Sequence, residues 1–243
     1  MNKDSSLRTE DLKLVLLICG DAKTGKKTIV KNIIQGKEYT EKEQPTFKSY
    51  FFTHQETINK TLISIPVEIR ILNSEELESE LKINKSFFSE ALGAFVVNSI
   101  KDENSFTNGE KWKDKIDLMC CLPNRFPLPV FLLINKCDEE ENKIYNKEKI
   151  ESYSLENQFF NTFLLANTET NINTANETNN IRTSNSENIK DLVVEANVPF
   201  KEIVKIIIGF KDIKNRFIAQ NGGTVDDDYD NSQQNKKKNC TIF

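Results

Sequence analysis

The sequence predicts an α/β fold in which a mainly parallel, six-stranded sheet carries helices on both faces. Near the start, an unbroken apolar segment leads into a glycine-containing loop and then into a segment with helical apolar spacing. Further along, apolar segments of strand length alternate with amphipathic segments of helix length, which is the pattern of repeated strand–helix units. A chain of 243 residues is long enough to bury the core of one such domain and to carry additional segments.

The first strand, loop and helix are predicted most directly. Residues Leu12–Ile18 are apolar apart from Lys13, which is typical of a strand buried on both faces. Residues 20–25 form the loop. A helix is expected over Lys26–Gln35, where apolar residues recur at helical spacing, and Gly36 is expected to end it.

A hairpin follows this unit. Strands are expected over Phe47–Thr53 and Leu62–Leu72, joined near Asn59–Lys60, because apolar and polar residues alternate strictly from position 63 to position 71. Three more strands are expected over residues 94–100, 130–134 and 162–165. Helices are expected over residues 106–118, 147–159 and 200–217, the last as one long amphipathic helix.

Two polar segments are expected to lie outside the core of a domain that spans residues 1–217. Residues 171–190 are rich in Asn, Thr, Ser and Glu and bury too little apolar surface to order themselves, so they are predicted to be a flexible insertion. Residues 218–243 are predicted to be a flexible tail, in which an acidic cluster precedes a basic one.

Composition excludes several classes of protein. The net charge of −4 argues against a protein that binds nucleic acid polymers. The sequence contains no apolar run of bilayer length and no signal peptide, so we expect no transmembrane segment. The five cysteines form neither a zinc-binding pattern nor a convincing disulfide framework, which favours a reducing, cytosolic setting.

The segment Gly20–Lys27 nearly matches the phosphate-binding loop G-x-x-x-x-G-K-[S/T], with a strand before it and a helix after it. Backbone N–H groups of such a loop converge on phosphates, and Lys26 would reach the β- and γ-phosphates. The alternative interpretation is a lysine-rich surface turn that binds nothing. The candidate phosphate-binding residues here are Gly20, Ala22, Lys23, Thr24, Gly25, Lys26, Lys27 and Thr28.

Position 27 departs from this pattern. The pattern has a Ser or Thr whose hydroxyl coordinates Mg²⁺, whereas the ammonium of Lys27 cannot bind a cation. The hydroxyl of Thr28 lies about 100° further around the helix and would need a shifted loop to serve instead. Mg²⁺ is therefore a candidate cofactor on which the protein depends less than the pattern would suggest.

Base recognition points to guanine. The segment Asn135-Lys136-Cys137-Asp138 directly follows the strand expected over residues 130–134. The carboxylate of Asp138 can accept hydrogen bonds from guanine N1 and N2, each contributing about 1.5–3 kcal/mol, and adenine lacks this pair of donors. Such a segment alone is a weak signal, but it gains weight when it follows a phosphate loop and a strand.

Together these segments resemble the small GTPases of the Ras superfamily, and the Rab branch more than the others. The resemblance covers about residues 12–208 without the insertion, and it implies a P-loop small-GTPase fold that binds GTP or GDP. It is carried by residues 20–28, by Pro45-Thr46 as switch I, by residues 87–97 after switch II, by Ser105-Phe106 with Trp112, and by residues 135–138.

The resemblance also assigns roles to single residues. Thr46 would bind Mg²⁺ and the γ-phosphate, and Tyr39 and Lys136 would lie against the guanine base. The family's last guanine-binding turn, which acts largely through a backbone N–H, corresponds to residues 167–169, with Thr183-Ser184-Asn185 as a second candidate. The candidate guanine-binding residues are Tyr39, Asn135, Lys136, Asp138, Asn167, Thr168 and Glu169.

Switch II is where the sequence departs most from the family. The D-x-x-G-Q segment aligns with residues 73–77. Asn73 replaces the Asp that holds the water shell of Mg²⁺, Glu76 replaces a Gly that meets the γ-phosphate, and Leu77 replaces the Gln that positions the attacking water. These changes predict that GTP hydrolysis is weak or absent. We therefore assign no catalytic residue. A misaligned segment is the alternative, although no D-x-x-G occurs between positions 46 and 135.

The last four residues, Cys240-Thr-Ile-Phe243, have the C-a-a-X form, in which a terminal Phe favours a geranylgeranyl group on Cys240. Lys236, Lys237 and Lys238 precede it and would add about 3 kcal/mol of attraction to an anionic membrane, at about 1 kcal/mol each. The alternative is an unmodified polar tail with a chance cysteine.

The leading hypothesis is a monomeric, Rab-like guanine-nucleotide-binding regulator on the cytoplasmic face of a membrane, in vesicle trafficking, with effector and regulatory proteins as partners. The alternative is a non-enzymatic adaptor that keeps the fold and acts through protein contacts. An enzyme that transfers phosphate to another substrate is a third and weaker hypothesis, because no second catalytic constellation is found.

Overall fold

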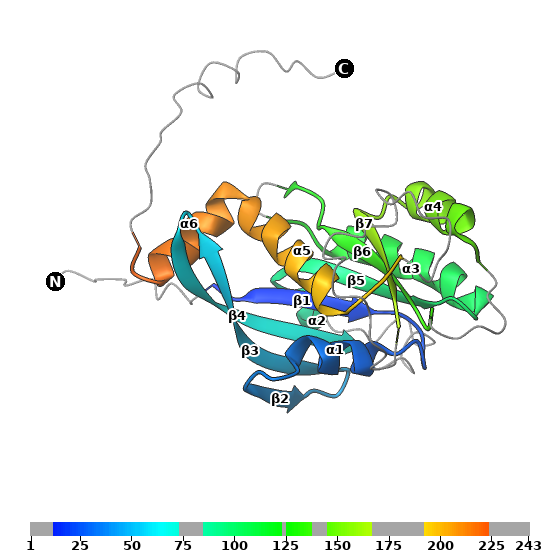
Figure 1. The fold of residues 1–243 in the computed structure, drawn as a ribbon, viewed down its shortest axis with the longest axis horizontal. Coiled ribbons are helices and arrows are strands. Elements are labelled where there is room, and N and C mark those ends of the chain that lie inside the picture. Colours follow the sequence, from blue (N-terminus) through cyan, green and yellow to red (C-terminus); the bar gives the residue numbers. More distant parts are fainter. Residues whose placement is uncertain (1–11, 73–84, 123–124, 138–144, 167–191, 224–243) are drawn as a thin grey trace, which may run out of the picture.

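The structure is a computed structural model, and it describes residues 12–72, 85–122, 125–137, 145–166 and 192–223. Within this part of the chain, eight strands form one sheet in the order β2-β3-β4-β1-β5-β6-β7-β8 (Figure 1). Strand β1 (Leu14–Cys19) lies near the middle, parallel to both β4 and β5, and all six of its residues are fully buried. An α/β fold with a mainly parallel sheet is therefore confirmed.

All six expected strands are present, with ends that differ by a few residues. They are β1, β3 (Phe47–Ile58), β4 (Thr61–Leu72), β5 (Ala91–Ser99), β6 (Val130–Asn135) and β7 (Asn161–Leu165). Strands β3 and β4 form the expected hairpin, and Asn59 and Lys60 form its turn with φ of 49° and 66°. Two successive residues with positive φ suit a two-residue hairpin loop, because its twist matches that of the strands.

The expected count of six strands is wrong, because two edge strands were not predicted. Strand β2 (Tyr39–Glu43) pairs antiparallel with β3, and β8 (Val193–Val194) pairs parallel with β7. All five residues of β2 are exposed, so no apolar periodicity marks it. Backbone pairing with β3 and an ion pair between Lys48 and Glu41 hold it instead.

Six helices occur in the described residues. They are α1 (Lys26–Ile34), α2 (Lys85–Phe88), α3 (Glu103–Met119), α4 (Lys147–Glu156), α5 (Asn197–Gly209) and α6 (Lys211–Gln220). Helices α3 and α5 cover opposite faces of β5. Gly93 of β5 leaves room for Ile203 and Ile207 of α5, while Asn98, which has the opposite parity on the strand, faces Gly109 of α3. The expectation of helices on both faces is confirmed.

The expectation of one long helix over residues 200–217 is wrong. The chain leaves helical geometry at Phe210, where φ is −72° and ψ is 118°, so that α5 and α6 are separate helices. Apolar residues keep their spacing across the break because both helices bury a face, and Gly209 weakens helix formation just before it. Helix α6 continues past position 217, and Asn221 after it exchanges hydrogen bonds with the backbone of Ser64 in β4.

Candidate functional site

The loop between β1 and α1 has the backbone geometry of a tight glycine turn. Gly20 has a φ of 135° and Gly25 a φ of 96°, a region of φ in which glycine is favoured. A Cβ added at Gly20 would lie 2.3 Å from the carbonyl oxygen of Val97 in β5. The loop therefore lies directly against the end of the neighbouring strand, and position 20 has room for no side chain.

Lys26, at the first position of α1, turns its side chain back into this loop. Its ammonium donates hydrogen bonds to the carbonyl oxygens of Gly20 at 2.6 Å and of Asp21 at 2.5 Å. The residue is only 7% exposed, and burial lowers the pKa of the Lys26 ammonium to about 8. Within the described residues it forms no ion pair, so its charge is met only by backbone dipoles and by attraction to more distant groups.

The segment after β6 is tied to the same loop. Asn135 is fully buried, and its side-chain amide donates a hydrogen bond of 2.8 Å to the carbonyl oxygen of Thr24. The next residue, Lys136, has a φ of 64°, and the backbone N–H of Cys137 donates to the carbonyl of Leu165 at the end of β7. The structure thus brings the phosphate-loop candidates and Asn135-Lys136 together at the carboxyl edge of the parallel strands, where such sheets bind ligands.

The structure adds a contact of Asn135 that the sequence did not predict, the hydrogen bond from its amide to the phosphate loop. Its expected contact with guanine stays a prediction. Two further residues were missed: the amide of Asn108 in α3 donates a 2.8 Å hydrogen bond to the carboxylate of Asp21. These positions are 87 residues apart, so no sequence motif links them.

The remaining loop candidates lie nearer to the solvent. Ala22, Lys23 and Lys27 are exposed, and Thr28 is partly buried on the first turn of α1. Thr24 is buried, and its hydroxyl donates to the carbonyl of Asp21 at 3.0 Å. The described residues contain no group of three or more His, Cys, Asp or Glu side chains that could hold a metal ion.

The structure separates the two candidates from the switch I region. Thr46 directly precedes Phe47, which pairs with Leu72 at the carboxyl end of β4, so Thr46 lies at the same edge of the sheet as the phosphate loop. Tyr39 pairs with Phe52, which is in register with the beginning of β1, at the opposite edge. The structure therefore does not bring Tyr39 to the phosphate loop, because its segment is paired in strand β2.

Several expected site residues lie outside the described residues and stay predictions. They are Asn73, Glu76, Leu77, Asp138, Asn167, Thr168, Glu169, the segment 183–185, Lys236 to Lys238, and Cys240. The insertion at 171–190 and the tail from 224 lie outside as well. In the part of the chain that is described, no helix is both long and apolar enough to cross a membrane.

Comparison with known proteins gives one family. The family model described as the Ras family matches residues 13–185. The chain is 33% identical over 81 residues to Ras-related protein Rab-32 of Homo sapiens, covering 33% of this chain and 36% of that protein. It is 26% identical over 149 residues to Ras-related protein Rab-7L1 of Homo sapiens, covering 59% and 68%.

A longer and weaker similarity extends along the whole sequence. Over 240 residues the chain is 22% identical to Ras-related protein RabH of Dictyostelium discoideum, covering 96% of this chain and 98% of that protein. The match to Rab-32, by contrast, spans little more than a third of that relative's length, 36%.

Proposed function

We propose that this chain, which belongs to the Ras family, is a Rab-like small GTPase regulator that binds guanine nucleotide at a membrane in vesicle trafficking. We further propose that it hydrolyses GTP weakly or not at all. The observation that most supports nucleotide binding is the arrangement of the loop around Lys26. Within the described residues, the buried ammonium of Lys26 bonds to two neutral backbone carbonyls. A phosphate that reached it would supply the opposite charge that a buried cation needs for compensation.

The loop fits a phosphate group. Gly20 and Gly25 adopt positive φ, and α1 begins at Lys26, so that N–H groups of its first turn have no partner within the helix. Residues 22–27 would hold the phosphates, and Asn135 would keep the loop in place through Thr24. Asp138 would then select guanine over adenine.

The same loop fits Mg²⁺ poorly. Lys27, an exposed cation, occupies the position at which a hydroxyl would bind the ion. Thr28 and Thr46 offer hydroxyl groups, and both are partly buried. We therefore expect that removing Mg²⁺ with a chelator changes nucleotide affinity little, and that Lys27 neutralises phosphate charge instead.

Weak hydrolysis is supported by the sequence of the switch II segment. Asn73, Glu76 and Leu77 lack the groups that hold the Mg²⁺ shell, meet the γ-phosphate and position the attacking water. Membrane attachment is supported by Cys240 and the three lysines before it, because one lipid chain with a basic segment supplies the two signals that stable anchoring requires.

A second candidate function is an adaptor that acts only through protein contacts. The departures at Lys27, Asn73, Glu76 and Leu77 favour it, because these positions would otherwise serve Mg²⁺, the γ-phosphate and the attacking water. The adaptor and the nucleotide-binding regulator differ in one measurable property, the affinity of the chain for guanine nucleotide.

Titration of the full chain with labelled GDP, GTP and ATP tests the proposal. We expect guanine nucleotides to bind in preference to ATP, and Asp138→Ala to remove the preference. Lys26→Ala should weaken binding about 10- to 100-fold, as expected when a charged hydrogen-bond donor is lost. Lys31→Ala, an exposed lysine on the same helix, is the matched control and should bind normally. Equal affinity for ATP, or no binding, would overturn the proposal.

A further inference from the structure

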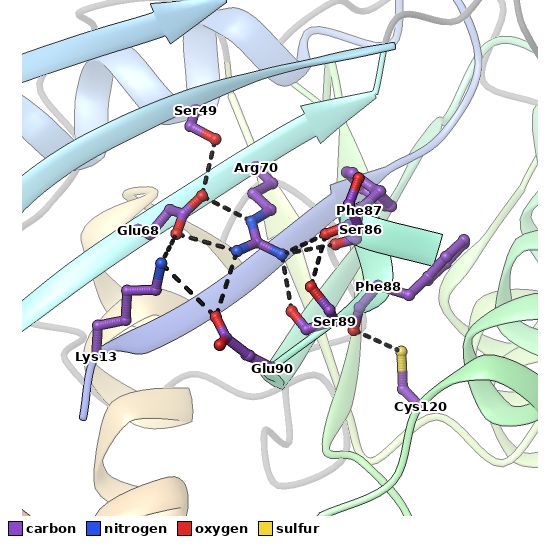
Figure 2. A network of polar contacts seen from close by, with 10 residues as sticks. All are labelled: Lys13, Ser49, Glu68, Arg70, Ser86, Phe87, Phe88, Ser89, Glu90 and Cys120. Carbon is purple, nitrogen blue, oxygen red and sulfur yellow. Dashed lines mark hydrogen bonds and ion pairs between the residues drawn. The ribbon is translucent and has the colours of Figure 1, made fainter. Parts of the chain in front are cut away.

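A second buried cation lies on the sheet away from the phosphate loop. Arg70 of β4 is 5% exposed, and its guanidinium forms two hydrogen bonds with the carboxylate of Glu68, at 2.7 Å from Nε and 3.1 Å from Nη2 (Figure 2). Two parallel bonds of this kind fix the plane of the guanidinium as well as its position. Arg70 is thus held rigidly by its neighbour on the same face of the strand.

The remaining nitrogen of Arg70 binds backbone carbonyls of α2 and of the residue that follows it. Its Nη1 donates to the carbonyl oxygens of Ser86 at 2.9 Å, Phe87 at 3.1 Å and Ser89 at 2.7 Å (Figure 2). Carbonyls at the end of a helix have no partner within the helix and must find one elsewhere. Arg70 therefore supplies the partner that allows α2 to end against the sheet.

Glu68 is itself held from two other strands. Ser49 of β3 donates to its carboxylate at 2.9 Å, and the ammonium of Lys13 lies 2.7 Å from it, just before β1. Burial opposes ionisation of Glu68, but the hydrogen bonds from Arg70, Lys13 and Ser49 outweigh it and lower its pKa to about 2. The carboxylate is therefore ionised at neutral pH. Glu68 and Arg70, which are both buried in β4, link residues 86–89 to the sheet.

Packing supports the same arrangement. Phe87 of α2 is fully buried, with its ring centroid 5.5 Å from that of Phe47 in β3, and Phe88 is 4% exposed. The sulfhydryl of Cys120, after α3, is 3.7 Å from the carbonyl oxygen of Phe88. None of these contacts involves the phosphate loop.

We propose that Arg70 and Glu68 are positioning residues that hold residues 85–90 in one arrangement whichever nucleotide is bound. Small GTPases ordinarily order their switch segments through contacts with the γ-phosphate and Mg²⁺. In this chain, residues 86–89, which follow the expected switch II, are held by hydrogen bonds from Arg70 in the sheet. The inference goes beyond the proposed function and holds whether or not the nucleotide binds.

Hydrogen exchange measured by mass spectrometry on the full chain tests this. Peptides covering residues 85–90 should exchange at the same rate in the nucleotide-free, GDP-loaded and GTPγS-loaded protein. Arg70→Met should speed their exchange by at least about tenfold, since bonds to a charged donor are lost, while peptides from β1 and α5 stay protected. A nucleotide-dependent difference above tenfold in the unmutated chain, or unchanged exchange in Arg70→Met, would overturn the proposal.

Two further variants keep the test decisive if Arg70→Met does not fold. Glu68→Gln keeps the shape of the acceptor but loses its charge, and should speed exchange in the same peptides by a smaller factor. Lys13→Met removes ion pairs to Glu68 at 2.7 Å and to Glu90 at 3.7 Å but no bond to the carbonyls of residues 86–89, so it should speed exchange less than Arg70→Met. Glu68→Gln without effect would contradict the proposal. Absence of nucleotide binding would instead contradict the proposed function, because the exchange of the nucleotide-free chain remains measurable.

Discussion

Lys26 at the start of helix α1 and Arg70 in strand β4 are both buried cations, and their partners differ. Lys26 bonds to two neutral carbonyls of its own loop, whereas Arg70 bonds to a carboxylate and to three carbonyls of another segment. Burial of a charge is costly unless an opposite charge and hydrogen bonds compensate for it. The charge of Arg70 is compensated by a carboxylate within the protein, whereas no carboxylate among the described residues forms an ion pair with Lys26. This difference is the basis for proposing that Lys26 binds an anion and that Arg70 has a structural role.

The largest effect on stability is expected from breaking the buried pair of Arg70 and Glu68. Arg70→Met leaves the carboxylate of Glu68 buried without its main partner and should lower the free energy of unfolding by about 3–5 kcal/mol. Urea denaturation of the full chain measures this. The double variant Arg70→Met with Glu68→Gln should lose less than the two single variants together, because the two residues act as one unit. Losses that simply add would show that they do not form a coupled pair.

A smaller effect is expected at the backbone of the phosphate loop. Gly20→Ala introduces a Cβ at 2.3 Å from the carbonyl of Val97 and a strained φ, and should destabilise the protein by about 1–3 kcal/mol. Gly36→Ala is the matched control, because its φ is also positive but no atom lies within 4 Å of the added Cβ. Thermal unfolding of both variants should show the larger loss for Gly20→Ala, and equal losses would argue against close packing of the loop on β5.

The smallest expected effect is a pH dependence of nucleotide affinity, which tests the role of Lys26. The pKa of its ammonium is lowered to about 8 by burial, and the negative charge of a bound phosphate would raise it. Below pH 8 the lysine is charged in both states, so affinity should not depend on its protonation. Above pH 8 binding must take up a proton, and affinity should fall by up to about tenfold for each pH unit.

Titration of GDP between pH 7 and pH 9.5 measures this dependence. Lys26→Arg removes the titrating group and should flatten the curve, while Lys31→Ala should keep it, and the titration of the guanine base itself is common to all three proteins. A curve for Lys26→Arg that is as steep as that of the unmutated chain would show that another group causes the dependence.

Periodicity and turn chemistry predicted the parts of the fold that are buried or locally encoded. The β1–loop–α1 unit and the turn at Asn59–Lys60 are where the sequence indicated, because apolar runs and glycines determine them locally. Strand β2 was missed because it carries no apolar residue pattern, and the break at Phe210 was missed because apolar spacing continues across it.

The candidate site was predictable only as far as its motifs are continuous. Lys26 and Asn135 belong to motifs, and the structure brings them to one edge of the sheet. The bond between Asn108 and Asp21, and those from Arg70 to residues 86–89, join positions that lie far apart in the sequence. Such contacts depend on how the helices and strands pack, and no local sequence pattern predicts them.

The fate of bound GTP tests most directly whether this chain binds guanine nucleotide and hydrolyses GTP weakly or not at all. The full chain would be loaded with GTP, freed of unbound nucleotide, incubated over several hours, and its nucleotide released by denaturation and identified by chromatography. We expect that most of the GTP is recovered unchanged. Recovery of GDP, at the rate of an ordinary member of the family, would contradict the assignment of Asn73, Glu76 and Leu77 to switch II, and recovery of no nucleotide would contradict the binding site itself.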